Sequence, residues 1–196
     1  MIKNIIFDFG GVLVDWNPHR LYDPYFGSKE KADWFLKNIC TMEWNTRMDA
    51  GKPFAEGTAE LAALHPEWKK EIYMYFDRWI DMMGDEIPGM RELVKELKDK
   101  GFHVYGLTNW SCETFNQVRY VYPIFALMED MVVSGEEHLL KPDEAIFRRL
   151  LEKFSLKAEE CLFIDDNLAN VEGARKAGLH AIRFQDAEQL KKDLPV

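Results

Sequence analysis

The chain has 196 residues, of which 47% are hydrophobic, enough for one large domain or for a domain that carries an insertion. Its formal net charge is -9 without any cluster of lysine and arginine, so no surface for nucleic acid is expected. No apolar run reaches membrane-spanning length, and Met1 to Lys3 leave no room for a signal peptide before the first predicted strand. Three widely spaced cysteines favour reduced thiols over disulfides, and we therefore expect a cytoplasmic protein.

The first predicted element is a short buried strand over residues 3–7. This apolar run is too short for a helix, and it ends at Asp8 and at the tight turn that Gly10 and Gly11 predict. A carboxylate at the carboxyl end of a core strand lies at the edge where open α/β sheets bind ligands. Taken alone, such an aspartate more often belongs to a turn or caps a helix, so its role depends on the rest of the chain.

The segment over residues 16–84 differs from the rest because it is rich in tryptophan and has apolar residues at helical spacing. Pro18, Pro24, Pro53 and Pro66 divide it into about four predicted helices. Most of its aromatic residues are expected to pack in a core. The segment follows Asp8 closely and is well placed to act as a lid.

Helices and strands alternate after this segment. In order, the pattern predicts a helix at 90–97 that Gly101 ends, a strand at 102–107, a helix at 111–119, a strand at 130–134, a helix after Pro142, a strand at 161–164, a helix at 168–177 and a strand at 181–184. Repeated strand and helix units predict a doubly wound parallel sheet. We therefore expect an α/β core over residues 1–15 and 85–196, with residues 16–84 as an inserted helical cap.

Polar residues stand at the ends of predicted strands and in nearby loops. They are Asp8, Thr108 with Asn109, Lys141, and Asp165 with Asp166. Each could cap a helix or be solvated, but together they suit one chemistry. Carboxylates that share one edge suit Mg²⁺, and a carboxylate beside this ion can attack a phosphoryl group while hydroxyl, amide and ammonium groups bind the phosphate oxygens.

Four stretches, FDFGGVLVD, LTNWS, LLKPDEAIF and FIDDNLANVEGARKAG, resemble in this order the four motifs of the haloacid dehalogenase superfamily. The resemblance covers nearly the whole chain, and the first and fourth motifs are the most specific. Most members of this superfamily are Mg²⁺-dependent phosphatases. The resemblance thus implies a Rossmann-like core with a helical cap of the type inserted after the first motif.

The resemblance also implies a role for each polar residue. Asp8 would be the nucleophile, Thr108 and Asn109 would bind phosphate, and Lys141 would stabilise the charge on nucleophile and phosphate. The metal ligands would be Asp8, the main-chain carbonyl of Gly10 and Asp166, with Asp165 behind them or as an alternative ligand.

One departure from the family pattern concerns proton transfer. Most family phosphatases carry a second aspartate two residues after the nucleophile as general acid and base, but this chain has Gly10 there. General acid catalysis contributes on the order of a hundredfold to ten-thousandfold in rate. Asp15, His19 or an acid of the cap such as Asp49 could replace it, or the enzyme could favour substrates with good leaving groups, such as a sugar 1-phosphate.

The function expected from these residues is Mg²⁺-dependent hydrolysis of a small phosphorylated metabolite, such as a sugar phosphate, through an aspartyl-phosphate on Asp8. One alternative is a 2-haloacid dehalogenase that uses Asp8 on carbon, although two acids at Asp165 and Asp166 would then disfavour the nucleophile. Another is a catalytically weak binding or regulatory protein of the same fold. A monomer or weak homodimer is expected.

The substrate is expected to be selected by the cap. The stretch DWNPHRLY resembles the branch of bacterial glucose-1-phosphate phosphatases. Aromatic and polar candidates for binding a sugar ring are Trp16, Asn17, Arg20, Trp44, Asn45, Arg47 and Asp49. Core packing for Trp44 and a surface ion pair for Arg47 fit equally well. The remaining histidines, His65, His103, His138 and His180, are expected to be structural or exposed.

Overall fold

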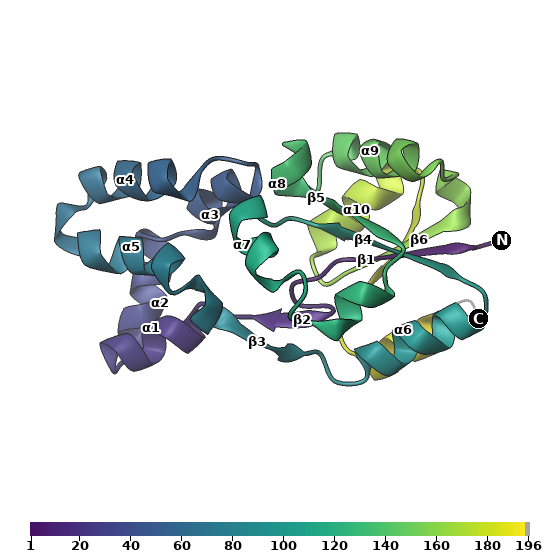
Figure 1. Cartoon of the computed structure of the whole chain (residues 1–196), viewed down its shortest axis with the longest axis horizontal. Coiled ribbons are helices and arrows are strands. Elements are labelled where there is room, and N and C mark those ends of the chain that lie inside the picture. The colour runs from purple at the N-terminus through teal and green to yellow at the C-terminus, as the bar shows by residue number, and fades with distance from the viewer. Residues whose placement is uncertain (195–196) are drawn as a thin grey trace.

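A five-stranded parallel sheet forms the centre of the larger lobe (Figure 1). In the computed structural model, which describes residues 1–194, its strands are β1 (Asn4–Phe7), β4 (His103–Thr108), β5 (Asp130–Val133), β6 (Cys161–Asp165) and β7 (His180–Arg183). Their order is β5-β4-β1-β6-β7, so β1 lies between β4 and β6. This arrangement confirms the predicted doubly wound core. Strands are added on one side of β1 up to β5 and on its other side from β6 onward, so the strand order reverses beside β1. Open α/β sheets bind ligands at such a reversal point.

Two layers of helices cover the sheet because its strands are apolar on both faces. Ile5 and Phe7 contact the layer that contains α6 (Met90–Asp99), α7 (Cys112–Val118) and α11 (Ala187–Asp193). Ile6 contacts the other layer, formed by α9 (Glu144–Phe154) and α10 (Leu168–Lys176). The alternation along β1 thus places successive side chains in opposite layers and fixes the strand in register. A short helix, α8 (Ser134–Glu137), follows β5.

The smaller lobe is helical and contains α1 (His19–Phe26), α2 (Lys29–Asn38), α3 (Met42–Asp49), α4 (Phe54–Leu64) and α5 (Lys69–Asp77), with 3₁₀ turns at Pro66–Trp68 and Trp79–Met82 (Figure 1). Stacked and tilted aromatic pairs fill its interior, among them Tyr22 with Phe35 and Phe35 with Trp68. Among residues 1–194, no helix is both long and apolar enough to cross a bilayer.

The lobe holds one helix more than the sequence predicts. Gly27 adopts a left-handed conformation that ends α1, and the Ser28 hydroxyl then accepts a hydrogen bond from the Lys31 amide at the start of α2. Pro24, which was expected to interrupt a helix, lies inside α1. The break between these two helices therefore lies at Gly27–Ser28 and not at Pro24, where the sequence places it.

An antiparallel ladder joins the two lobes where the chain passes between them. It pairs β2 (Val14–Trp16) with β3 (Met83–Glu86) and was not expected from the sequence. Hydrogen bonds from Asn17 to Met82 and from Ile87 to Leu13 extend it on either side. The division into residues 1–15 plus 85–196 and 16–84 stays a proposal, and its boundaries fall within this ladder.

The lobes also contact each other away from the ladder, along a line that we call the seam. The Asp49 carboxylate and the Asp49 carbonyl accept hydrogen bonds from the Ser111 amide and the Ser134 hydroxyl, at 3.1 and 2.6 Å. Nearby, the Glu113 carboxylate accepts a hydrogen bond of 2.8 Å from the Phe54 amide. The helical lobe is thus attached to the sheet lobe in two separate places.

Close packing around Phe9 gives a test of the core. The Phe9 ring stacks on Phe125 with centroids 4.6 Å apart, and a Cβ atom at Gly106 would lie 2.3 Å from its Cζ atom. We expect Gly106→Ala to lower the free energy of unfolding by about 1–3 kcal/mol, since the ring and its stack must shift. Urea unfolding followed by circular dichroism measures this change. Gly10→Ala is the matched control, because a Cβ there meets nothing within 4 Å and should cost far less.

Candidate active site

Asp8 lies directly after β1, at the carboxyl edge of the sheet. Its side chain is 11% exposed, and one carboxylate oxygen accepts a hydrogen bond of 2.7 Å from the Phe9 amide. The carboxylate faces the same cavity as Thr108, which ends β4 and is 1% exposed. Since β1 and β4 are neighbouring parallel strands, their ends bring these two side chains to one edge.

Lys141 joins two of the predicted acidic residues. Its ammonium is 2.8 Å from an oxygen of Asp8 and 2.7 Å from an oxygen of Asp165, the last residue of β6. Asp165 is fully buried, and its oxygens also accept hydrogen bonds from the Asn170 side chain and the Asn167 amide. Asp165 therefore holds Lys141 at a fixed place beside Asp8.

Burial and charge change the pKa values of this cluster. Burial, together with the negative charge of Asp165, raises the pKa of Asp8 to about 7, although Lys141 opposes this shift. Burial lowers the pKa of Lys141, but the two carboxylates outweigh it, and its pKa lies above the ordinary value. The ammonium thus stays charged, and a further cation at Asp8 would favour the nucleophilic carboxylate.

Asn109 positions Lys141 through the backbone. Its side-chain amide donates to the Lys141 carbonyl at 3.0 Å and accepts from the Lys141 amide at 2.9 Å. Both ends of this amide are therefore engaged in holding the Lys141 backbone. The sequence predicted that Asn109 belongs to the site but not that it supports Lys141.

Three carboxylates at this edge could hold a divalent cation. Oxygens of Asp8, Asp165 and Asp166 lie within 4.8 Å of one another. Burial and the charge of Asp165 raise the pKa of Asp166, whose carboxylate lies so close to the backbone of Gly11 that a Cβ there would be 2.8 Å from it. Three acids against one ammonium leave excess negative charge, and oxygen ligands of this kind fit Mg²⁺.

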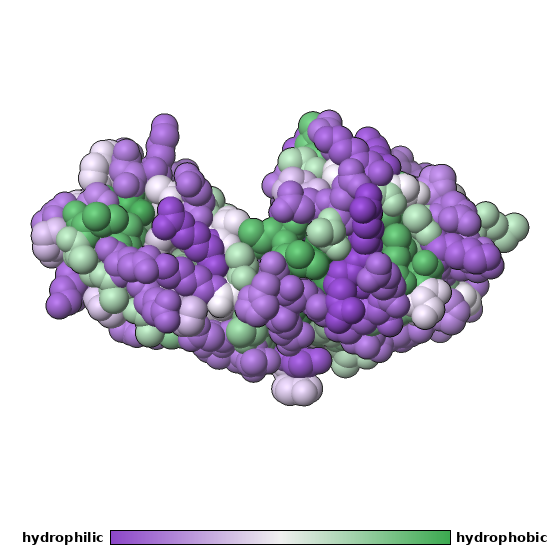
Figure 2. All heavy atoms as spheres, turned by 90° about the horizontal axis from the view of Figure 1, so that it is seen from above, coloured by the Kyte–Doolittle hydropathy of each residue, from purple (hydrophilic) through white to green (hydrophobic). Residues whose placement is uncertain are grey.

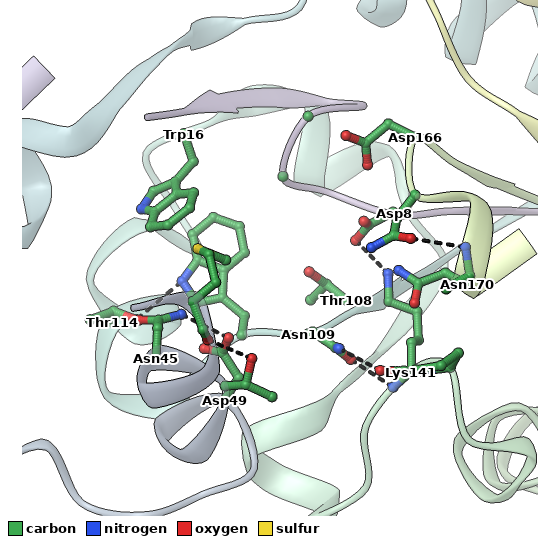
Figure 3. A pocket seen from close by; sticks show the side chains of 18 of the residues that line it. Asp8, Trp16, Asn45, Asp49, Thr108, Asn109, Thr114, Lys141, Asp166 and Asn170 are labelled. Carbon is green, nitrogen blue, oxygen red and sulfur yellow. Dashed lines mark hydrogen bonds and ion pairs between the residues drawn. The ribbon is translucent and has the colours of Figure 1, made fainter. Parts of the chain in front are cut away.

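A cavity of about 510 Å³ opens in front of this cluster, between the two lobes. Figure 3 shows Asp8, Lys141, Asp166 and Asn170 on one side of the opening, and Trp16, Asn45, Asp49 and Thr114 on the other. The space-filling view shows the molecule indented between its two lobes (Figure 2). A molecule bound in the cavity would touch both the acidic cluster and the helical lobe.

The wall opposite Asp8 is mostly apolar and only partly predicted. Trp16, Asn45 and Asp49 line it as expected, whereas Trp44 is buried with its indole bonded to the Gly57 carbonyl and Arg47 is exposed. The residues that sequence reasoning missed are Met42, Thr46, Phe54, Trp79, Trp110 and Thr114. Only Trp110 carried a signal, since it lies inside the LTNWS stretch. Asn170 was missed too, although it lies in the last motif.

The candidates for the missing acid are placed very differently. Asp15 forms an ion pair with Arg20 beside β3, and His19 is 2.8 Å from Asp23 and 3.3 Å from Asp33. Neither Asp15 nor His19 lines the cavity, while Asp49 does. Burial raises the pKa of Asp49 to about 7, although hydrogen bonds from the Ser111 amide and Asn45 oppose the shift.

Comparison with protein families gives the family of the chain. Residues 2–178 match the model of the haloacid dehalogenase-like hydrolases. The chain belongs to this hydrolase family. The match includes Asp8, Thr108, Lys141 and Asp166, the residues that the structure gathers at the edge of the sheet.

Individual relatives agree with this assignment. The chain is 28% identical to sesquiterpene phosphatase astK of Aspergillus oryzae, over 94% of this chain and 91% of that protein. It is 24% identical to D-ribitol-5-phosphate phosphatase of Bacteroides thetaiotaomicron, over 100% and 98%. A magnesium complex of a HAD family enzyme from Bacteroides thetaiotaomicron has a TM-score of 0.75 at 22% identity and covers 97% of each chain, which supports the fold.

The raised pKa of Asp49 predicts a pH-dependent stability. Its pKa is about 7 in the folded protein and near the ordinary value of 3.8 when unfolded, so the folded state binds the extra proton between these values. Stability from this group is therefore present at low pH and is lost as pH rises through 7. Relative to wild type, Asp49→Asn should gain on the order of 2 kcal/mol between about pH 5 and about pH 8.

Urea unfolding at several pH values, without added metal, measures this gain. Asp81→Asn is the control, because Asp81 is an exposed carboxylate of the same lobe whose partner, Arg78, stays charged over this range. A stability difference between wild type and Asp49→Asn that does not change with pH would contradict the prediction.

Proposed function

We propose that the protein is a Mg²⁺-dependent phosphatase that hydrolyses a small phosphorylated metabolite through an aspartyl-phosphate on Asp8. The observation that carries this proposal is the buried contact of Lys141 with both Asp8 and Asp165, open to a cavity that Asp166 also lines. An anionic ligand needs compensating positive charge at such a site, and a carboxylate held there can act as a nucleophile. Phosphatase activity among its relatives supports the same reaction.

Each residue has a defined task in this reaction. Asp8 attacks phosphorus, while the Thr108 hydroxyl, the Asn109 main chain and the Lys141 ammonium bind the phosphoryl oxygens. Asp8, the Gly10 carbonyl and Asp166 would hold Mg²⁺, which when bound would offset the negative charge of the phosphate. Asp165 supports Lys141, and it remains near enough to be an alternative ligand.

Dehalogenation on carbon is a weaker candidate for this site. A carboxylate that displaces halide without a metal needs neighbours that do not add negative charge. Here Asp165 raises the pKa of Asp8, and Asp166 lies within the same acidic cluster. This surplus of carboxylates suits a site that binds a cation.

The cavity supports a substrate whose organic group has an apolar face. Trp16, Trp79 and Trp110 supply aromatic surface, and Asn45 and Thr46 supply hydrogen-bonding groups. This combination suits a sugar ring, whose two faces are apolar and whose hydroxyls are polar. We propose a sugar phosphate as substrate, with the protein acting in the cytoplasm as a monomer or weak homodimer.

Phosphate release from 4-nitrophenyl phosphate and from sugar phosphates, with Mg²⁺ or with a chelator, tests the reaction. We expect release that needs Mg²⁺ and that falls at least a thousandfold in Asp8→Asn, since the nucleophile is then absent. Acid quenching of the wild type during turnover should trap phosphate on Asp8, which mass spectrometry locates. Release that survives Asp8→Asn would contradict the aspartyl-phosphate.

A panel of substrates tests the organic group. We expect sugar phosphates to have higher kcat/KM than phosphoserine, whose small charged group offers no apolar face to the tryptophans. Trp79→Ala should raise KM for the preferred sugar phosphate several-fold while changing kcat less, because the indole binds the organic group rather than the phosphate. Equal kcat/KM for both classes would argue against a sugar phosphate.

A further inference from the structure

Transfer of phosphate to Asp8 leaves an alkoxide that needs a proton, and the chain near Asp8 offers none. The residue two positions further on is Gly10, where a Cβ atom would meet nothing within 4 Å. A Cβ atom would thus have open space at this position, but the chain has no side chain there. The proton must therefore come from another group that reaches the cavity.

Few of the residues that line the cavity could donate this proton. On the sheet side, Asp8, Lys141 and Asp166 are committed to the nucleophile, the phosphate charge and the cation. Among the described residues that line the rest of the wall, Asp49 is the one with a side chain that titrates in the physiological range. It lies across the opening from Asp8 in Figure 3, on the side where the leaving group of a bound phosphate would extend.

Hydrogen bonds fix the Asp49 carboxyl group relative to the phosphate-binding residues. One oxygen accepts from the Ser111 amide at 3.1 Å, and the other accepts from the Asn45 side chain at 2.9 Å. Ser111 lies only two residues beyond Asn109, so Asp49 is tied to the loop that follows β4. A carboxyl group carried by the helical lobe is in this way positioned by the sheet lobe.

A large fraction of Asp49 is protonated near neutral pH for a clear physical reason. Burial raises its pKa to about 7, against the hydrogen bonds from Ser111 and Asn45 and the charge of Lys141. Tyr75 from α5 faces it as well and is itself neutral, because burial raises the pKa of Tyr75. An acid with a pKa near the working pH can both donate and accept a proton efficiently.

We propose that Asp49 is the general acid and base of this enzyme and replaces the side chain missing at Gly10. The inference rests on the phosphatase activity proposed above. As Asp8 bonds to phosphorus and the bond to the leaving oxygen breaks, protonated Asp49 gives its proton to that oxygen. Asp49 then takes a proton from the water that attacks phosphorus, the bond to Asp8 breaks, and hydrogen phosphate leaves with Asp8 and Asp49 restored.

Leaving groups of different basicity test this role. In single turnovers with Mg²⁺, 4-nitrophenyl phosphate needs no acid in the first step, whereas 2-phenylethyl phosphate does. Asp49→Asn should slow alcohol release from 2-phenylethyl phosphate by about a hundredfold or more and 4-nitrophenolate release by less than about threefold. For the wild type, the rate with 2-phenylethyl phosphate should fall as pH rises above 7. Asp49→Asn should not show this fall in rate.

Restoring an acid at the empty position completes the test. The double variant Asp49→Asn with Gly10→Asp should regain at least tenfold in the rate with the alkyl ester, because the new side chain has open space. Thr46→Val, on the same helix and in the same cavity, is the control and should change both esters by similar factors. Asp49→Ser serves as a second variant at the same site if Asp49→Asn folds poorly.

The two proposals fail in distinguishable ways. Equal loss with both esters in Asp49→Asn, with no recovery through Gly10→Asp, would mean that Asp49 is merely structural and would overturn this inference. Failure of the wild type to release either product would overturn the phosphatase itself, and the inference with it.

Discussion

The contact between Lys141 and two carboxylates is the constraint on which the site depends. Burying an ammonium between Asp8 and Asp165 is tolerable only because the charges compensate one another and the remaining oxygens of Asp165 are hydrogen-bonded. Removing one partner from such a buried pair typically costs about 3–5 kcal/mol. The turn after β1, the loop before α9 and the end of β6 are consequently held together by one charge.

The two lobes contribute different parts of the site around this cluster. The parallel sheet brings Asp8, Thr108 and Asp165 to one edge because its strands end at the same level. The helical lobe supplies most of the aromatic wall that a ligand's organic group would meet, and Trp110 of the sheet lobe completes it. One continuous apolar cluster nevertheless runs through both lobes, from Phe7 and Phe9 to Tyr22 and Trp44. The lobe that forms the wall is therefore packed into the same core as the sheet.

The sequence predicts most of the fold because apolar periodicity is strong in the core. The strands β1, β4 and β6 lie where the pattern predicts them, and so do α7 after β4 and α10 after β6. The ladder of β2 and β3 was not predicted, since three- and four-residue strands that contain Asp15 and Gly84 show no alternation. Gly27 was missed as a helix end because Pro24, three residues earlier, predicts the break, whereas the helix continues through this proline to Gly27.

The site is predictable to the extent that it lies at strand ends. Polar residues that end neighbouring parallel strands must meet, so Asp8, Thr108 and Asp165 could be grouped in advance. The aromatic wall could not, because Trp79 and Trp110 come from distant segments and meet only once the two lobes are placed against each other. Asp49 is likewise buried only when the two lobes are in place, and its raised pKa could therefore not be predicted from the sequence.

The seam does more than attach the helical lobe to the sheet lobe, because it also affects the protonation of Asp49. Burial at the seam raises the pKa of Asp49, against the hydrogen bond from the Ser111 amide, so an opening of the seam that admitted water would let this pKa fall toward the ordinary value. By thermodynamic reciprocity, a bound proton favours the closed arrangement as strongly as closure favours the proton.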